Sequence, residues 1–203
     1  MTERVPRSFY ARSAREVARD LLGITLVRNN SGIRVSGKIV ETEAYCDTEE
    51  RDLACHADRA NEGRPTARTA VMFGPAGFCY VYFTYGMHWM LNIVTGSEGK
   101  AGAVLIRALE PIDGLEQMRR LRGRPDNELT NGPAKLTQAL AIDGSHNSTD
   151  LCLLDSLIWL EYGSPRRADK ISSGPRIGLG KTPEPWLSMP WRYWITDNRH
   201  VSR

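Results

Sequence analysis

Residues 24–45 have the pattern of two β-strands joined by a short turn. The segments ITLVR and IRVSGKIVETEAY are rich in β-branched residues, and the turn-forming residues NNSG stand between them. Successive side chains of a strand point to opposite faces, so Glu41, Glu43 and Tyr45 share one face of the second strand. The pattern therefore predicts an antiparallel pair that carries two carboxylates and a phenol on one surface.

A helix is predicted immediately before this pair. The sequence SARE has the form of a capping box, with Ser13 as the N-cap and Glu16 as the third helical residue. Apolar residues at helical spacing follow, and Gly23 is a typical end.

The rest of the chain alternates between strand and helix patterns. We predict a hairpin over residues 78–96 with its tip at 84–87, a strand over 102–111 ended by Pro111, helices over 113–122 and 132–142, and short strands at 156–162, 176–180 and 191–197. The sequence shows no internal repeat or linker. These patterns predict an α+β fold: a single domain of residues 1–203 with a curved, mainly antiparallel β-sheet flanked by helices and a protruding β-hairpin.

The composition is that of a soluble protein. Hydrophobic residues make up 41% and charged residues 25% of the 203 residues, and no apolar segment approaches the about 18 residues that a membrane span needs. The N-terminal segment lacks the apolar core of a secretory signal. We therefore expect a cytoplasmic protein with no membrane partner, associated with the nucleoid in a bacterium or nuclear in a eukaryote.

The basic residues are strongly biased toward arginine. The chain has 22 Arg against 5 Lys and a net charge of +3. The planar guanidinium suits phosphate contacts better than an ammonium does, which favours a polyanionic partner. A G+C-rich genome would produce the same bias, so composition alone leaves a nucleic-acid partner open.

The cysteines give no sign of a metal site. Cys46, Cys55, Cys79 and Cys152 have irregular spacings, without a C-x-x-C motif or a histidine at zinc-finger distance. We predict no structural metal, and we interpret the four cysteines as free thiols that behave as small apolar groups.

The two glutamates of the second strand allow two interpretations. Alternate acidic residues on a strand can simply face water. In a cleft, however, one carboxylate can act as a general base toward water when neighbouring charges and aromatic rings control its ionisation. Arg107 interrupts an apolar strand, so we expect it to pair with an acid of the same sheet. Asn92 is a similar polar interruption, either a satisfied core amide or a pocket residue.

The predicted hairpin tip carries unusual residues. Turn tips normally contain Asn, Asp or Gly, but here Tyr85 and Met87 flank Gly86. Either the tip folds back onto its own domain, or it is a wedge that enters the minor groove of DNA. The polar, aperiodic segment 47–70, which contains His56, is either disordered or a functional loop.

Several motifs, taken in order, resemble the alkyladenine (3-methyladenine) DNA glycosylase family of the mammalian type. They are IVETEAY, the CH pair at 55–56, YVYFTYGMHWMLNI, VLIRALEP, GLEQMRRLR and GPAKLTQALAI, and they span nearly the whole chain. The resemblance implies that Glu43 deprotonates the attacking water, helped by Arg107 and by the backbone carbonyl of Ile177.

The same resemblance implies the roles of the remaining site residues. The damaged base would stack among Tyr45, His56 and Tyr82, and Asn92 would obstruct the amino group of guanine. We therefore expect Glu43 to open onto a hollow walled by these three rings. Tyr85, with Met87 beside it, would fill the gap left by the flipped nucleotide. The chain departs from the family pattern at Thr84, His88 and Trp89, which could alter the depth of the hairpin or the substrate range.

The implied activity is that of a monofunctional DNA glycosylase in base excision repair. It would flip alkylated purines out of duplex DNA, hydrolyse the N-glycosidic bond and leave an abasic site, as a monomer without a cofactor or metal. No lysine stands near the motifs in sequence, which favours water over an amine nucleophile, although Lys135 could be near in space. The alternatives are a non-catalytic nucleic-acid-binding module of the same fold and a glycoside hydrolase that uses Glu41 and Glu43 as a pair.

Overall fold

The computed structural model describes residues 3–46, 51–59, 63–163 and 170–202. The strands of these residues are β1 (Thr25–Asn30), β2 (Ile33–Tyr45), β3 (Cys79–Thr84), β4 (His88–Val94), β5 (Ala103–Asp113), β6 (Ile158–Glu161), β7 (Ile171–Gly174) and β8 (Arg192–Ile195). Within the described residues they form one antiparallel eight-stranded sheet with the order β3-β4-β5-β2-β1-β6, and β8 pairs with β2 and β7.

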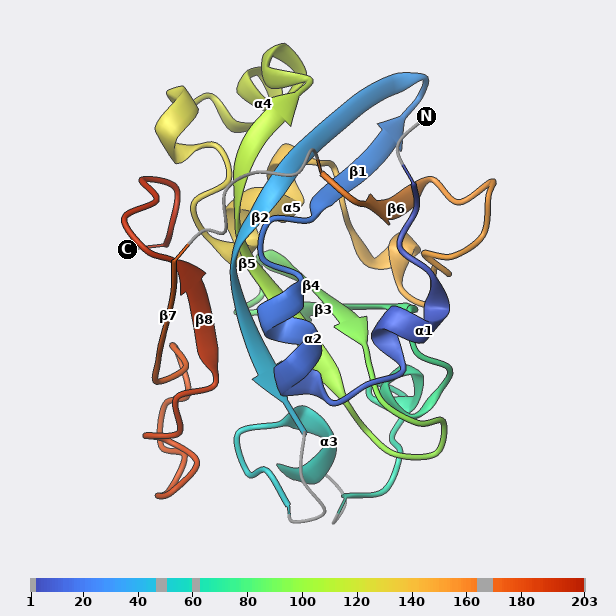
Figure 1. The fold of residues 1–203 in the computed structure, drawn as a ribbon, viewed down its shortest axis with the longest axis vertical. Helices are drawn as coiled ribbons and strands as arrows, with labels where there is room; N and C mark the ends of the chain where they lie inside the picture. Colours follow the sequence, from blue (N-terminus) through green and yellow to red (C-terminus); the bar gives the residue numbers. More distant parts are fainter. Residues whose placement is uncertain (1–2, 47–50, 60–62, 164–169, 203) are drawn as a thin grey trace.

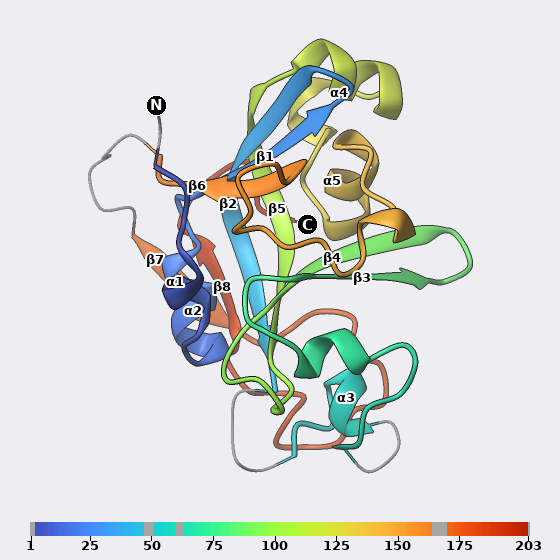
Figure 2. The ribbon, with the colours of Figure 1, turned by 90° about the vertical axis from the view of Figure 1, so that its right-hand side faces the viewer.

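Helices surround this sheet (Figures 1 and 2). The α-helices are α1 (Arg7–Tyr10), α2 (Ala14–Asp20), α3 (His56–Arg59), α4 (Leu115–Arg122) and α5 (Pro133–Ala139), and short 3-10 helices are η2 (Ala70–Phe73), η3 (Asp126–Glu128) and η4 (Gly144–His146). The main core packs apolar residues of α2, α4 and α5 together with residues of the strands, including Val17, Met118, Leu136 and Ile106. The predicted α+β fold with a curved antiparallel sheet is confirmed.

Strand β2 organises the sheet and the site. It pairs with β5 along one edge, and on the other edge with β1 over its first half and with β8 at residues 41–43. Its register against β5 shifts near Gly37 and on either side of Glu41. Such irregularities bend a strand, and Figure 1 shows β2 as a long curved arrow through the middle of the molecule. The second half of β2, which carries the two glutamates, is therefore enclosed by β5 and β8.

The predicted end of one strand and the existence of another are wrong. Strand β5 continues through Pro111 to Asp113, because Pro111 pairs with Gly37 beside a register shift, where a missing N–H is tolerated. Residues 176–180 do not form a strand, since Gly178 and Gly180 have left-handed φ angles of +79° and +59°. The strand that pairs with β8 is instead β7, just before this segment.

The predicted hairpin is confirmed as β3 and β4. Its loop consists of residues 85–87. Tyr85 and Gly86 have φ angles of +52° and +68°, and the Met87 N–H donates to the Thr84 carbonyl over 3.2 Å. A left-handed pair of this kind matches the natural twist of a β-hairpin. Figure 2 shows the hairpin projecting from the body of the molecule.

Helix α2 supports β2 on the face opposite the glutamates. The predicted capping box is present: Glu16 N–H donates to the Ser13 hydroxyl, and Ser13 N–H donates to the Glu16 carboxylate. The buried hydroxyl of Thr42 donates to the Ala18 carbonyl over 2.8 Å, at the last turn of the helix. Because Thr42 lies between Glu41 and Glu43 and points to the other face, this bond fixes the helix to the back of the site.

We expect Thr42→Val to lower the free energy of unfolding by about 1–3 kcal/mol, because the Ala18 carbonyl loses its buried donor while the volume is conserved. Urea denaturation followed by circular dichroism measures this change. Thr42→Ser, which keeps the hydroxyl, is the matched control and should lose less stability. Equal losses in the two variants would show that the hydrogen bond contributes nothing.

Candidate active site

Arg107 of β5 bridges the two glutamates of β2. Its Nε lies 3.0 Å from Glu41 Oε1, and its Nη1 lies 3.2 Å from Glu43 Oε1. Both glutamates are completely buried, so they do not face water as the simpler interpretation required. The expectation that Arg107 pairs with an acid of the same sheet is confirmed.

Glu41 is held by further donors. Arg192 Nη1 of β8 lies 3.1 Å from Glu41 Oε1, while the N–H and hydroxyl of Ser202 donate to the same carboxylate over 2.7 and 2.9 Å. With Arg107 these contacts occupy both oxygens of Glu41. Glu41 is therefore an anchor for Arg107.

Glu43 receives three donors from three different elements. The Tyr45 hydroxyl donates to Oε2 over 2.8 Å, while the Ile177 N–H donates over 2.6 Å to Oε1, the oxygen that Arg107 also contacts. Burial raises the pKa of Glu43 above its ordinary value, and the charge of Arg107 and the bonds from Ile177 and Tyr45 offset this rise only in part. Glu43 is thus a carboxylate whose ionisation is set by its neighbours, as a general base requires.

A pocket of about 270 Å³ lies beside this carboxylate. The predicted residues that line it are Tyr45, His56, Tyr82, Tyr85, Asn92, Arg107 and Ile177. Glu43 is not in direct contact with the pocket, contrary to the expectation that it opens onto a hollow. It lies behind Tyr45, Arg107 and Ile177, the groups that donate to it and that form this part of the wall.

The aromatic wall consists of His56, Tyr80 and Tyr82. The ring of His56 meets that of Tyr82 edge to face at 4.6 Å, and the rings of Tyr80 and Tyr82 are 5.2 Å apart. His56 Nδ1 lies 3.2 Å from the Tyr80 hydroxyl. Burial, with the nearby charges of Arg68 and Arg59, lowers the pKa of His56 to about 4, so the ring is neutral near pH 7. Our assignment of the wall missed Tyr80, although its i, i+2 spacing from Tyr82 places both on one face of β3.

Asn92 of β4 is both a core amide and a pocket residue, the two interpretations that the sequence left open. Its side chain is buried and its amide nitrogen donates to the Tyr80 carbonyl over 3.1 Å, as a core amide does. The same residue lines the pocket.

Tyr85 and Met87 extend from the hairpin tip into solvent. Their side chains are 75% and 68% exposed, which excludes the alternative that the tip folds back onto its own domain. Tyr85 also borders the mouth of the pocket. An exposed aromatic ring next to a pocket is the arrangement that a wedge requires.

Ile177 contacts the site in a way that the resemblance did not imply. The predicted group was its backbone carbonyl, whereas the contact with Glu43 is made by its backbone N–H. The side chain of Ile177 is exposed.

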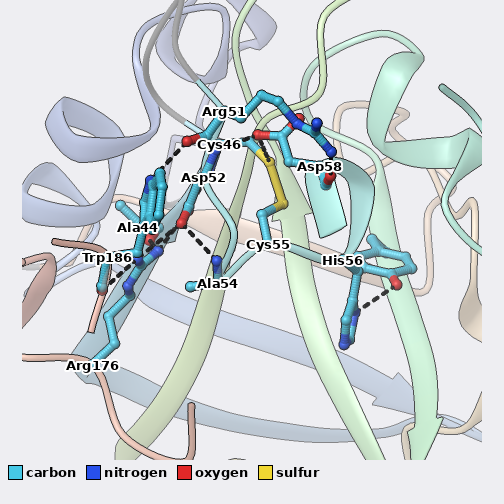
Figure 3. Close-up of a disulfide and its surroundings, with 11 residues drawn as sticks. Ala44, Cys46, Arg51, Asp52, Ala54, Cys55, His56, Asp58, Arg176 and Trp186 are labelled. Atoms are coloured by element: carbon cyan, nitrogen blue, oxygen red, sulfur yellow. Dashed lines mark hydrogen bonds and ion pairs between the residues drawn. A yellow bond between two sulfur atoms is a disulfide. The ribbon is translucent and has the colours of Figure 1, made fainter. Parts of the chain in front are cut away.

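The prediction of four free cysteines is wrong for two of them. Cys46, at the end of β2, forms a disulfide with Cys55, which immediately precedes His56 (Figure 3). Cys79 and Cys152 are free. The loop folds back because the Asp52 carboxylate accepts hydrogen bonds from the N–H groups of Cys46 and Ala54, over 3.1 and 3.0 Å. This loop belongs to the predicted segment 47–70, of which residues 47–50 and 60–62 lie outside the described part.

No group of three or more potential ligands among His, Cys, Asp and Glu could hold a metal ion within the described ranges. In the same ranges, no helix has the length and apolar character needed to cross a membrane.

Comparisons with known proteins decide the family. The sequence profile described as methylpurine-DNA glycosylase (MPG) matches residues 8–199. The chain belongs to the methylpurine-DNA glycosylase family. Three relatives carry the name "Putative 3-methyladenine DNA glycosylase". The protein from Carboxydothermus hydrogenoformans is 46% identical over 98% of both chains, that from Myxococcus xanthus is 45% identical over 98% of this chain and 93% of the relative, and that from Rhodopseudomonas palustris is 47% identical over 98% and 91%. These relatives are bacterial, so they support the family but not the mammalian type.

We expect removal of the disulfide to reduce stability without unfolding the protein. The bridge closes a loop of about ten residues, for which restriction of the unfolded chain contributes roughly 2–3 kcal/mol. A double variant, Cys46→Ser with Cys55→Ser, should lose about this free energy in urea denaturation. A dithiol reductant should destabilise the wild type similarly but leave the double variant unchanged. If the reductant leaves the wild type as stable as before, the bridge does not contribute.

Proposed function

We propose that the chain is a monofunctional DNA glycosylase that hydrolyses the N-glycosidic bond of alkylated purines flipped out of duplex DNA. The observation that carries this proposal is the position of Glu43, directly behind a pocket walled by Tyr45, His56 and Tyr82. Membership of the methylpurine-DNA glycosylase family supports DNA as the substrate.

The pocket suits a flipped base. A base cannot be excised while stacked, so it leaves the duplex at a cost of roughly a few kcal/mol and enters the enzyme. Aromatic faces attract a positively charged N-alkylpurine more than a neutral purine. Because His56 is neutral near pH 7, it does not repel that charge. The pocket therefore favours alkylated bases over normal ones.

Glu43 acts as the base that activates water. Its Oε1 accepts a hydrogen bond from Ile177 and is paired with Arg107, whereas Oε2 accepts, among the described residues, from Tyr45 alone. Because Glu43 lies behind the pocket wall, the water must pass Tyr45 to reach it. Oε2, which can accept a second hydrogen bond, then takes the water proton, and the Ile177 carbonyl helps to hold the water. The anion also stabilises the oxocarbenium character of the sugar as the base leaves.

Hydrolysis by water is favoured over an amine intermediate. Lys135 does not line the pocket; it lies in an adjoining groove, where its Nζ donates to Asn131 over 2.9 Å. The residues that the structure describes as lining the pocket include no lysine. The product is therefore an abasic site in an uncut strand.

Tyr85 takes the place of the flipped nucleotide in the duplex. Its exposed ring stands at the end of the hairpin and borders the pocket, and Met87 is exposed beside it. Proteins that bind the minor groove insert side chains of this kind between base steps. The stacking of Tyr85 offsets part of the cost of flipping.

We expect Glu43→Gln to lower the rate of base release by roughly 10²–10⁴-fold, because an amide cannot accept the water proton. The assay uses a duplex with one 3-methyladenine or 7-methylguanine and measures alkali-labile strand breaks. Glu110→Gln on β5, which alters a carboxylate paired with Lys38 at the sheet surface, is the control. Equal rates in Glu43→Gln and wild type would remove Glu43 from its role, and binding without release by wild type would favour the non-catalytic module.

We expect Tyr85→Ala to weaken binding to a lesion-containing duplex by roughly 5- to 150-fold, the range expected for loss of one stacking contact of about 1–3 kcal/mol. The fold should be unaffected, since the side chain is mostly exposed. Leu154→Ala removes another highly exposed apolar side chain and is the matched control. Unchanged affinity of Tyr85→Ala in a fluorescence anisotropy titration would show that the tip is not a wedge.

A further inference from the structure

Arg176 and Asp52 form a buried, two-point ion pair beside the site. Arg176 Nη1 lies 2.7 Å from Asp52 Oδ2, and Arg176 Nη2 lies 3.0 Å from Oδ1. Both side chains are completely inaccessible to solvent. Figure 3 shows the pair reaching from the C-terminal segment to the disulfide loop. Each buried charge loses its hydration, so the pair is stable only when hydrogen bonds replace the lost water contacts. The two parallel bonds between the guanidinium and the carboxylate do so.

The guanidinium of Arg176 has partners on other segments as well. It donates to the Ala44 carbonyl over 3.0 Å and to the Trp186 carbonyl over 3.2 Å. It also stacks between the rings of Tyr45 and Trp191, with centroid distances of 4.8 and 4.9 Å. A second bond, from Trp186 Nε1 to the Arg51 carbonyl, joins the same loop and C-terminal segment.

Each segment joined by Arg176 carries a group of the site. Ala44 lies between Glu43 and Tyr45 on β2. The loop around Asp52 leads through Cys55 to His56. Arg176 itself precedes Ile177, whose N–H donates to Glu43.

We propose that Arg176 and Asp52 are positioning residues that hold the backbone of residue 177 against Glu43 and so set the ionisation and alignment of the base. The inference rests on the proposed function. Neither residue is among those that line the pocket. They act through Ile177 and through the ring of Tyr45.

The physical reason is the length and direction of one hydrogen bond. The Ile177 N–H stabilises the ionised form of Glu43, and burial opposes it. The other charged or titratable groups that act on this carboxylate are Arg107 of β5, Glu41 and Tyr45 of β2 and Tyr82 of β3, with Arg192 of β8 reaching Glu41. Loss of the Ile177 N–H bond raises the pKa of Glu43. A shift of the Tyr45 ring, which stacks on Arg176, weakens the Tyr45 bond to Glu43 and raises the pKa further.

The test compares Arg176→Lys and Asp52→Asn with wild type. A lysine keeps the charge but cannot form the two-point pair or the stacked contacts. Asparagine keeps the shape of Asp52 and removes its charge. Arg34→Lys is the control, because Arg34 also forms ion pairs, with Asp113 and Glu161, but at the other end of β2.

The measurement is single-turnover release of 3-methyladenine across pH, together with affinity for a duplex that contains an abasic analogue. We expect a roughly 10- to 100-fold lower rate near pH 6 in both variants and an acidic limb about one pH unit higher, since a weaker N–H bond makes Glu43 protonate more readily. Affinity for the abasic analogue should be unchanged, because no base enters the pocket. Arg34→Lys should behave as wild type.

Several outcomes would overturn the inference. One is that folded Asp52→Asn releases base at the wild-type rate and shows the same acidic limb in its pH profile as wild type. A second is a fall in rate that is proportional to the loss of folded protein. A purely structural role would lower the rate in this way without shifting the acidic limb of the pH profile. If Arg176→Lys does not fold, Asp52→Asn decides. If the wild type releases no base, the proposed function is refuted. If the wild type is active and Glu43→Gln is inactive, but Asp52→Asn has the wild-type rate and pH profile, only the inference is refuted.

Discussion

The site depends on one buried interaction, the guanidinium of Arg107 between the carboxylates of Glu41 and Glu43. A carboxylate without solvent is stable as an anion only when a cation or several donors face it, and removal of one partner from such a pair costs about 3–5 kcal/mol. The antiparallel register of β2 and β5, with Thr42 opposite Ile106, sets this arrangement. A slip by one residue would turn Arg107 to the opposite face of the sheet and leave both acids unpaired. The pairing of the buried charges and the register of β2 against β5 therefore depend on each other.

The site combines residues of the sheet with residues that lie outside it. Glu43, Tyr45 and Arg107 lie on long paired strands, and Tyr80, Tyr82 and Asn92 lie on the hairpin. His56, at the start of α3, and Ile177, in contrast, lie outside the sheet and far apart in sequence. Their segments are joined by the Asp52–Arg176 pair and by the bond from Trp186 to the Arg51 carbonyl. Strands hold the groups that must keep their charge, and loops supply the groups that close the pocket. This division is usual for sites in which a scaffold positions variable loops.

Much of this arrangement could be predicted from local patterns. The alternation of Glu41, Glu43 and Tyr45 placed three groups on one face, and the isolated Arg107 in an apolar strand required an acidic partner. What could not be predicted depends on contacts between distant segments. The bond from the Ile177 N–H and the pair of Arg176 with Asp52 leave no periodic signal, and the spacing of Cys46 and Cys55 does not show whether the loop between them folds back. The strand expected at 176–180 is absent because Gly178 and Gly180 adopt left-handed backbone angles that a strand does not allow, although Ile177 and Leu179 favour one.

The loop between Cys46 and Cys55 is braced twice, by a covalent bond and by the hydrogen bonds of the Asp52 carboxylate. These two braces respond to different surroundings. Compartments rich in glutathione and thioredoxin keep thiols reduced, and there the covalent brace opens while the carboxylate is unaffected. In oxidising surroundings both hold. When the disulfide is reduced, the hydrogen bonds of the Asp52 carboxylate therefore still hold the backbone before His56 in place.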